Sequence, residues 1–147
     1  MNKPIFSIMI SQYEIIFRLL LASLLGGLVG YEREKKHRPA GLRTHMLVCL
    51  GSTLITICGL YGFPGSDTSR LSAAIIGGIG FLGAGTIIAS RGHIAGLTTA
   101  ASVWAIGGIG ISVGVGFYLA SILSAVLMLL ILKLKDIEKQ TFIHRFR

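Results

Sequence analysis

Apolar residues along the chain gather into five long runs, separated by short segments rich in charged residues, glycine or proline. Each run approaches the roughly 20 residues that an α-helix needs to cross the hydrocarbon core of a bilayer. We therefore predict an all-α membrane protein with five transmembrane helices in residues 1–135, followed by a short basic cytoplasmic tail, residues 136–147. The predicted spans cover about residues 14–31, 43–61, 70–90, 97–113 and 117–134.

The polar segment between the first two runs sets the predicted orientation. Residues 26–45 read GGLVGYEREKKHRPAGLRTH, and five Lys and Arg residues lie within positions 33–43. Short basic loops of membrane proteins stay on the cytoplasmic side. We predict an N-out, C-in topology, because it places eleven basic residues inside and three outside. Pro39 and Gly41 predict a tight turn, in which Gly41 is free to adopt positive φ.

Glycine is concentrated in the third and fourth runs, where twelve of the twenty glycines lie between Gly77 and Gly116. Small faces let helix backbones approach closely in lipid, so we predict a glycine-rich hairpin of helices three and four. Its expected contact stripes, together with a face on helix one, are Ala73, Gly77, Gly80 and Ala84, then Gly96, Ala100, Val103 and Gly107, and finally Gly26 and Gly30. The alternative is a broken helix lining a transport pathway, built from Gly77, Gly80, Gly83, Gly85, Thr98 and Thr99.

The composition agrees with a membrane protein and gives no sign of nucleic-acid binding or catalysis. Hydrophobic residues make up 52% of the chain, charged residues 14%, and the mean hydropathy is +0.76. The net charge of +8 comes from basic residues at helix ends, so we expect anionic lipids of the inner leaflet as partners and no nucleic acid. Cys49 and Cys58 lie about 180° apart on one predicted helix, which excludes a bond between them. No motif indicates a catalytic residue, a metal site or a cofactor.

The charged residues around the first loop form the main candidate site. We predict that Glu32, Arg33, Arg38, Arg43 and His45 meet at the cytoplasmic face, with Glu32 and Arg43 paired across the turn. Such a cluster either clamps the turn or binds an ion, a phosphate-bearing ligand or a partner protein.

Two further charged positions lie toward the other end of the predicted bundle. Asp67 and Arg70 form an outer pair, in which Asp67 caps helix three and Arg70 anchors it at the headgroups. Arg18 lies inside the first run, four residues after Glu14. The favoured interpretation is that Arg18 extends outward to the headgroups, and the alternative is an ion pair with Glu14.

Three stretches of the chain resemble the MgtC/SapB family of bacterial inner-membrane proteins, across about residues 14–113. They are GLVGYEREKKHRPAGLRTH, SRLSAAIIGGIGFLGAGTII and GLTTAASVWAIGGIG. The resemblance implies a multi-pass protein of the bacterial cytoplasmic membrane, linked to growth at low magnesium, virulence and control of membrane energetics. It also implies a membrane partner such as ATP synthase, which some members inhibit. The longer MgtC-like members carry a soluble C-terminal domain, so the resemblance favours the short, SapB-like form.

Two functions are compatible with these observations. The first is a non-enzymatic regulator that binds another membrane component, with a homo-oligomer as a possible state. The second is a small ion or solute transporter or channel that uses the glycine-rich hairpin. The sequence favours regulation, because the hairpin lacks the carboxylates that Mg²⁺ prefers and that cation pathways usually contain.

Overall fold

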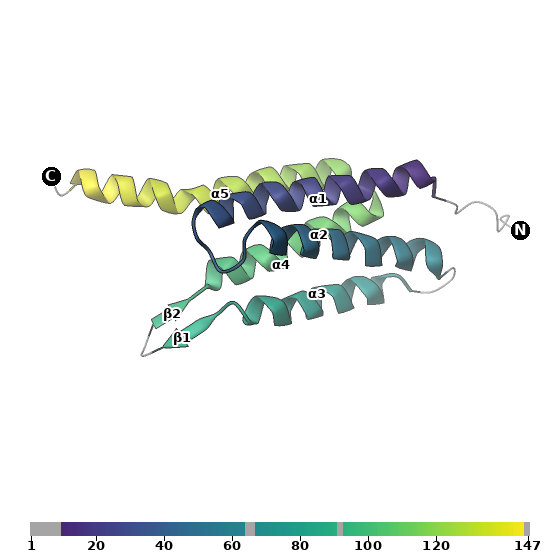
Figure 1. Cartoon of the computed structure of the whole chain (residues 1–147), viewed down its shortest axis with the longest axis horizontal. Coiled ribbons are helices and arrows are strands. Elements are labelled where there is room, and N and C mark those ends of the chain that lie inside the picture. The colour runs from purple at the N-terminus through teal and green to yellow at the C-terminus, as the bar shows by residue number, and fades with distance from the viewer. Residues whose placement is uncertain (1–9, 64–66, 91–92, 146–147) are drawn as a thin grey trace, which may run out of the picture.

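The computed structural model describes residues 10–63, 67–90 and 93–145, without the side chains of 88–90, 93 and 135–145. Five helices and one short antiparallel hairpin follow one another along the described chain (Figure 1). The helices are α1 (Gln12–Lys35), α2 (Leu42–Ile57, continued by a π-helical turn at Cys58–Gly62), α3 (Ser69–Ala84), α4 (Leu97–Val115) and α5 (Tyr118–Arg145). Strands β1 (Ile88–Ser90) and β2 (His93–Ala95) connect α3 to α4. Expectations about residues 1–9, 64–66, 91–92 and 146–147 lie outside the described residues.

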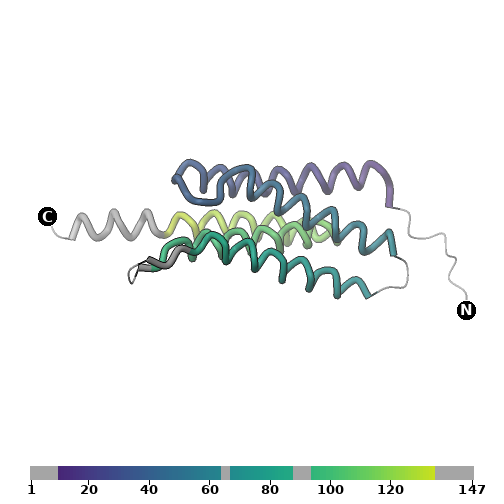
Figure 2. Tube along the Cα trace, turned by 60° about the horizontal axis from the view of Figure 1, so that its bottom comes forward, coloured from purple at the N-terminus to yellow at the C-terminus, as the bar shows by residue number. Residues whose placement is uncertain are grey.

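The helices run lengthwise in one elongated bundle, with α1 beginning at one end and α5 leaving at the other (Figures 1 and 2). Helices α2 and α4 are central, because α2 contacts α1, α3 and α4, while α4 also contacts α3 and α5. The hairpin and the α1–α2 connection lie at the same end. Large apolar side chains on the outer faces of α1 and α5, such as Leu24, Leu28, Leu127 and Leu130, are exposed. This distribution suits a surface that faces lipid.

Three described helices are long and apolar enough to cross a membrane: Gln12–Lys35, Leu42–Gly62 and Leu97–Val115. Ser69–Ala84 and Tyr118–Leu134 are shorter apolar helices. The predicted helical architecture is therefore confirmed, with three helices that are candidate membrane spans, and five complete crossings stay a prediction.

Helix α1 packs on α2 through the small residues that the sequence indicates. A Cβ atom on Gly26 would lie 2.7 Å from the carbonyl oxygen of His45, and one on Gly30 would lie 2.7 Å from the Cα atom of Leu42. Both distances are far below van der Waals contact, so only glycine permits this approach.

The contact face of α3 differs from the predicted one. The stripe Ala73, Gly77, Gly80 and Ala84 is exposed, and a Cβ atom on Gly77 or Gly80 would meet nothing within 4 Å. Ile75, Ile79 and Gly83 are the buried residues of α3. A Cβ atom on Gly107 would lie 2.2 Å from Cδ1 of Ile79, and one on Gly83 would lie 3.2 Å from the carbonyl oxygen of Ala100. The residues predicted for α4 therefore do contact α3. The stripe predicted for α3 lies on the face that points away from the other helices of the chain.

The predicted third span is too long at its C-terminal end. Helix α3 ends at Ala84 and not near Ser90, because the hydroxyl of Thr86 donates to the Gly83 carbonyl (2.8 Å) and competes with the helical pattern. The chain then forms the hairpin in place of a direct turn into α4. Gly96 closes the hairpin at φ +92, where a Cβ atom would lie 2.0 Å from the Thr86 carbonyl oxygen. Glycine is required there on both conformational and steric grounds.

The predicted tail is helical in its backbone. Helix α5 continues without interruption to Arg145, eleven residues beyond the end of the predicted fifth span at Leu134. The side chains of this extension lie outside the described residues, so its predicted contacts with lipid stay a prediction.

Candidate functional site

The end of α1 brings two arginines together through a specific helix-terminating turn. The backbone N–H of Arg38 donates to the Arg33 carbonyl (3.1 Å), and that of His37 donates to the Glu34 carbonyl (2.9 Å). These two bonds, with His37 left-handed at φ 52, form a Schellman motif. Gly41, which is free to adopt positive φ, has φ −111, and the left-handed position falls on His37. The motif places Arg33 and Arg38 close in space although five positions separate them.

The ion pairs at this end differ from the predicted pairing. Glu32 binds the guanidinium of Arg33, with Nη2 at 2.8 Å from Oε1, and Nζ of Lys36 lies 2.7 Å from the same oxygen. Arg43 is exposed and forms no ion pair with the described residues. The predicted Glu32–Arg43 pair is therefore wrong, because Arg33 on α1 and the C-cap residue Lys36 bind the Glu32 carboxylate. Glu34 instead reaches α2, where its Oε2 accepts a bond from the backbone N–H of Leu42 (2.7 Å).

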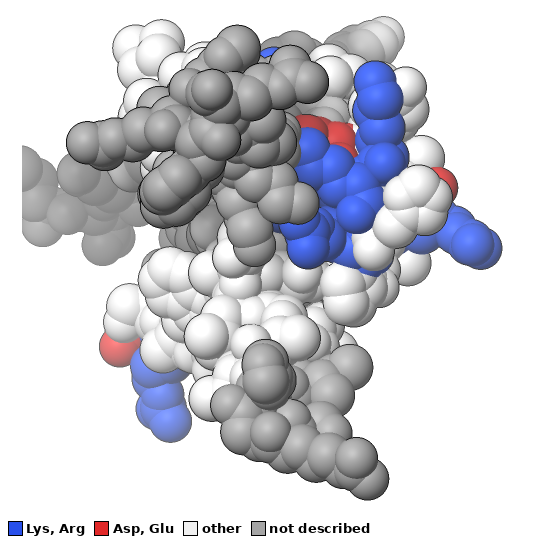
Figure 3. Space-filling view, turned by 90° about the vertical axis from the view of Figure 1, so that its left-hand side faces the viewer, with Lys and Arg blue, Asp and Glu red and all other residues white. Residues whose placement is uncertain are grey.

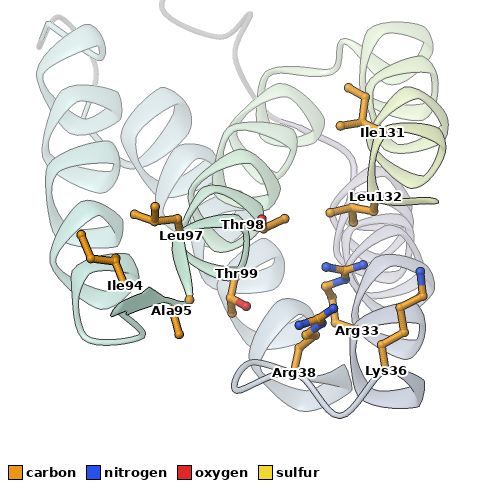
Figure 4. Close-up of a pocket in the computed structure, with 11 residues that line it drawn as sticks. Arg33, Lys36, Arg38, Ile94, Ala95, Leu97, Thr98, Thr99, Ile131 and Leu132 are labelled. Atoms are coloured by element: carbon orange, nitrogen blue, oxygen red, sulfur yellow. The ribbon is translucent and has the colours of Figure 1, made fainter. Parts of the chain in front are cut away.

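A basic cavity of about 550 Å³ opens beside this turn. Figure 3 shows Lys and Arg side chains gathered at this end of the molecule. Arg33, Lys36 and Arg38 line the cavity on one side, and Thr98 and Thr99 line it from the start of α4 (Figure 4). Apolar side chains complete the wall, with Ile94 and Leu97 near the hairpin and Ile131 and Leu132 on α5. No acidic residue is among the described residues that line it.

Two of the predicted site residues are deeply buried at the cavity. Arg33 is 3% exposed, and its Nη1 forms no hydrogen bond within the described chain. Thr99 is also 3% exposed, and its hydroxyl has no partner among the described residues. Every fully buried polar side-chain atom of the described residues has a hydrogen-bond partner. Since Nη1 of Arg33 and the Thr99 hydroxyl have none, neither atom is fully buried, and both must reach open space. The cavity is the space that these two side chains line.

His45 does not line the cavity but lies buried next to the α4 residues that do. Its ring is fully buried, with Nδ1 at 2.9 Å from the Gly41 carbonyl oxygen and Nε2 at 3.1 Å from Oγ of Ser102. The hydroxyl of Ser102 in turn lies 2.8 Å from the Thr99 carbonyl oxygen. His45 therefore ties the start of α2 to the first turn of α4, which carries Thr99.

The predicted cluster is thus only partly assembled. Glu32, Arg33 and Arg38 come together, while His45 lies one layer deeper and Arg43 lies apart. The glycines and threonines predicted as a packing face or pathway also separate. Gly77 and Gly80 are exposed on α3, Gly83 and Gly85 lie near the end of α3, and Thr98 and Thr99 belong to the basic cavity.

Asp67 of the predicted outer pair does bond the start of α3, from one position before the N-cap residue Thr68. Oδ1 of Asp67 accepts bonds from the Ser69 hydroxyl (2.6 Å) and the Ser69 backbone N–H (3.0 Å) at the start of α3. These two bonds hold the pKa of the Asp67 carboxyl below its ordinary value. Arg70 is exposed, and its side chain forms no ion pair with Asp67.

Sequence reasoning found only part of a second polar cluster, at the opposite end of the bundle, because it missed the contacts of Arg18 with Tyr118 and Gly114. Arg18 is 7% exposed and does not extend outward. Its Nε contacts Glu14 (3.0 Å) and the Tyr118 hydroxyl (2.9 Å), and its Nη1 donates to the Gly114 carbonyl (2.6 Å). The Tyr118 hydroxyl also donates to Glu14. The favoured interpretation of Arg18 was therefore wrong and the alternative Glu14 pair is present, and the spacing of four residues was the available signal.

No metal centre is visible in the described residues, which contain no group of three or more His, Cys, Asp or Glu side chains placed to hold an ion. Cys49 is buried and Cys58 exposed, and both are free thiols.

The chain was then compared with known proteins. Residues 19–140 match the MgtC family. A relative from Escherichia coli K12, named "Putative magnesium transporter YhiD", is 42% identical over 128 residues, which cover 82% of this chain and 60% of that protein. Protein SapB of Bacillus subtilis is 39% identical across 80% of this chain and 54% of its own length. Protein MgtC of Salmonella typhimurium LT2 is 39% identical across 80% of this chain and 51% of its own length.

The chain spans between about half and three fifths of the length of these relatives, and SapB and MgtC extend beyond the matched region to a similar degree. No solved structure matches the chain. The family match over most of the chain, together with several apolar helices long enough to cross a membrane, shows that this multi-pass membrane protein belongs to the MgtC family.

Proposed function

We propose that this chain is a non-enzymatic regulator in the bacterial cytoplasmic membrane, where it adjusts membrane energetics or ion homeostasis when magnesium is scarce. It acts by binding another membrane component at its basic end. In this proposal all five helices cross the bilayer in an N-out, C-in arrangement. The relatives support the link to magnesium, since one of them carries a magnesium-transport description in its name.

The observation that carries the choice of regulation over transport is the chemistry of the buried interior. The buried polar residues of the described chain include no acidic side chain; they are Arg18, Arg33, His45, Ser52, Thr53, Thr56, Thr99, Ser102 and Ser121. A magnesium ion prefers carboxylates and retains much of its hydration shell. The buried residues would offer a magnesium ion two positively charged side chains, Arg18 and Arg33, and no carboxylate. Such an interior is a poor pathway for the ion.

The buried hydroxyls are also occupied by their own helices. The hydroxyls of Ser52, Thr53 and Thr56 each donate to the carbonyl four residues earlier, at 2.7 to 3.0 Å. Such bonds satisfy the hydroxyl locally and leave little capacity to replace the water around an ion. The basic cavity, by contrast, holds polar groups with unused donors at the end of the bundle.

The alternative function is transport through the glycine-rich hairpin of α3 and α4. The name of the Escherichia coli relative favours it, and the exposed glycines of α3 leave space along one face. A second copy of the chain packed against Gly77 and Gly80 would enclose that space, so this alternative calls for a homo-oligomer.

Purified protein in liposomes separates the two functions. We expect no saturable flux of magnesium, protons or phosphate. We also expect co-purification of a membrane complex from cells grown at low magnesium. The proton-driven ATP synthase, which the family resemblance implies, is the first partner to seek.

Two variants sharpen this comparison. Arg38→Glu should remove the complex, whereas Arg43→Glu, the same charge reversal at a residue outside the cavity, should retain it. Saturable magnesium flux that is abolished by Gly83→Leu would replace the regulatory proposal with transport.

A further inference from the structure

We infer that the basic cavity binds the phosphate group of an anionic amphiphile, such as a phospholipid. The inference rests on the proposed function, since it names the ligand class of the site assigned there. Arg33, Arg38 and Thr99 recognise the phosphate, and the apolar wall formed by Ile94 and Ile131 accommodates the adjoining chain.

The cavity presents hydrogen-bond donors that have no acceptors. Arg33 is almost fully buried, and its Nη1 is unused by the described chain. Arg38 lines the same cavity and has no ion pair with the described residues. Thr99 is as little exposed as Arg33, and its hydroxyl forms no hydrogen bond with the described residues. Figure 4 shows the side chains of Arg33 and Arg38 next to each other, with Thr99 to one side and Leu132 above them.

Backbone groups add further donors at the same place. The first intrahelical bond of α4 runs from the Ala100 N–H to the Gly96 carbonyl (2.8 Å), and no side chain caps the helix. The N–H groups of Leu97, Thr98 and Thr99 are therefore left at the start of a helix of 19 residues. They carry the partial positive charge of the helix N-terminus, which favours an anion.

The charges of the cavity call for an anion rather than a neutral ligand. Arg33, Lys36 and Arg38 bring three positive charges to the cavity, whose described lining contains no acidic side chain. Glu32 binds Arg33 and Lys36 beside it. Like charges brought together in a partly dry site repel one another, and a bound anion removes that repulsion. A phosphate supplies several acceptor oxygens that match the planar fork of arginine.

The apolar part of the wall favours a lipid as the source of the phosphate. Ile94, Leu97 and Ile131 are each more than half exposed, and they line the cavity beside the basic side chains. This end of the bundle also carries the basic loop, which lies at the level of the headgroups in the proposed topology. An acyl chain can follow these side chains while the phosphate occupies the donors.

Binding to the purified full chain in uncharged detergent tests the inference. The probes are a short-chain phosphatidate, a diacylglycerol with the same acyl chains but no phosphate, and inorganic phosphate, all followed by calorimetric titration. We expect saturable binding of phosphatidate and none of diacylglycerol. If inorganic phosphate competes at concentrations similar to phosphatidate, the ligand is a free phosphate; if it does not, the ligand is a lipid phosphate. Equal binding of diacylglycerol would overturn the inference.

Two variants of equal charge provide the matched control. Arg38→Gln should weaken phosphatidate binding by about tenfold, because a charged hydrogen-bond partner is lost. Arg43→Gln removes one charge from the same loop outside the cavity and should leave binding within about twofold of the wild type. Equal weakening in both variants would mean diffuse surface attraction and would overturn the site.

A third variant addresses folding and the hydroxyl. Thr99→Val keeps the branched shape, and we expect weaker phosphatidate binding with an unchanged helical circular dichroism spectrum. Unchanged binding would remove Thr99 from the site.

If phosphatidate binds as expected but Arg38→Gln leaves growth at low magnesium unaltered, the site stands and the proposed function fails. If the growth defect occurs without phosphatidate binding, the inferred site fails alone.

Discussion

At the scale of single residues, glycine decides how closely the helices approach, and its positions are not equivalent. On α4, a Cβ atom at Gly110 would lie 2.4 Å from the carbonyl oxygen of Cys49, whereas at Gly108 it would meet nothing within 4 Å. The two glycines are two positions apart and therefore lie on different faces of the helix. The Gly110 carbonyl also accepts a hydrogen bond from the Thr53 hydroxyl (2.7 Å), which fixes the contact between α2 and α4.

Alanine should destabilise the protein at Gly110 but not at Gly108. Gly110→Ala should lower the free energy of unfolding by about 1–3 kcal/mol, because the methyl group meets backbone that cannot move aside. Gly108→Ala should be neutral or raise it by up to about 1 kcal/mol, since alanine is the better helix former. Denaturation in mixed detergent micelles, followed by circular dichroism, measures both. Equal effects would show that α2 and α4 are not in close contact at Gly110.

At the scale of elements, the end of α1 depends on one residue in an unfavourable backbone conformation. His37 is the non-glycine residue with positive φ among those described, and the Schellman bonds on either side of it place Arg33 beside Arg38. A left-handed residue with a side chain costs roughly 1–2 kcal/mol. The turn persists because the bonds on both sides of His37 and the packing of α1 on α2 determine it together.

Substitutions at His37 should therefore behave unlike substitutions in a helix. His37→Gly should stabilise the protein by about 0.5 kcal/mol, as the relief of strain exceeds the added freedom of the unfolded chain. His37→Val should destabilise it by about 1 kcal/mol or more, because branched residues tolerate positive φ poorly. Thermal unfolding measures these changes.

The control is Arg43→Gly, in the first turn of α2, where glycine should destabilise by up to about 1 kcal/mol. A loss of stability in His37→Gly comparable to that in Arg43→Gly would contradict the left-handed turn.

At the scale of the whole molecule, α1 begins at one end of the bundle and α5 leaves at the opposite end, as an odd number of crossings requires. The basic α1–α2 connection marks one end, and the start of α3 marks the other. Basic residues near the ends of spans orient membrane proteins, so we assign the first of these ends to the cytoplasm.

Single cysteines introduced at the two ends test this orientation. In a chain with Cys49 and Cys58 replaced by serine, Thr44→Cys should react with a membrane-impermeant thiol reagent only after the membrane is opened. Gly62→Cys, at an exposed position near the opposite end, should react in intact cells. The reverse pattern would invert the topology, and labelling of both sites from outside would exclude an odd number of crossings between them.

The sequence predicted the local features of this protein well, because chain-local properties determine them. The five apolar runs, the basic loop and the small contact face of α1 at Gly26 and Gly30 follow from helix length, charge and spacing. The candidate site was predicted in part. Arg33 and Arg38 are close in sequence, whereas Thr99, which lines the same cavity, comes from a helix some sixty positions later. That its hydroxyl lacks a described partner depends on the tertiary structure.

The tertiary structure alone decided which face of each helix turns inward. In water an apolar stripe marks the buried face, but lipid tails are as apolar as leucine, so hydrophobic periodicity in a membrane helix does not separate inside from outside. The small stripe of α3 therefore looked like a contact face and is exposed, while Arg18 looked like an outward-facing residue and is buried against Glu14 and Gly114. Length and charge determined the helices and the end of the bundle that carries the basic loop, and close packing between backbones determined its interior.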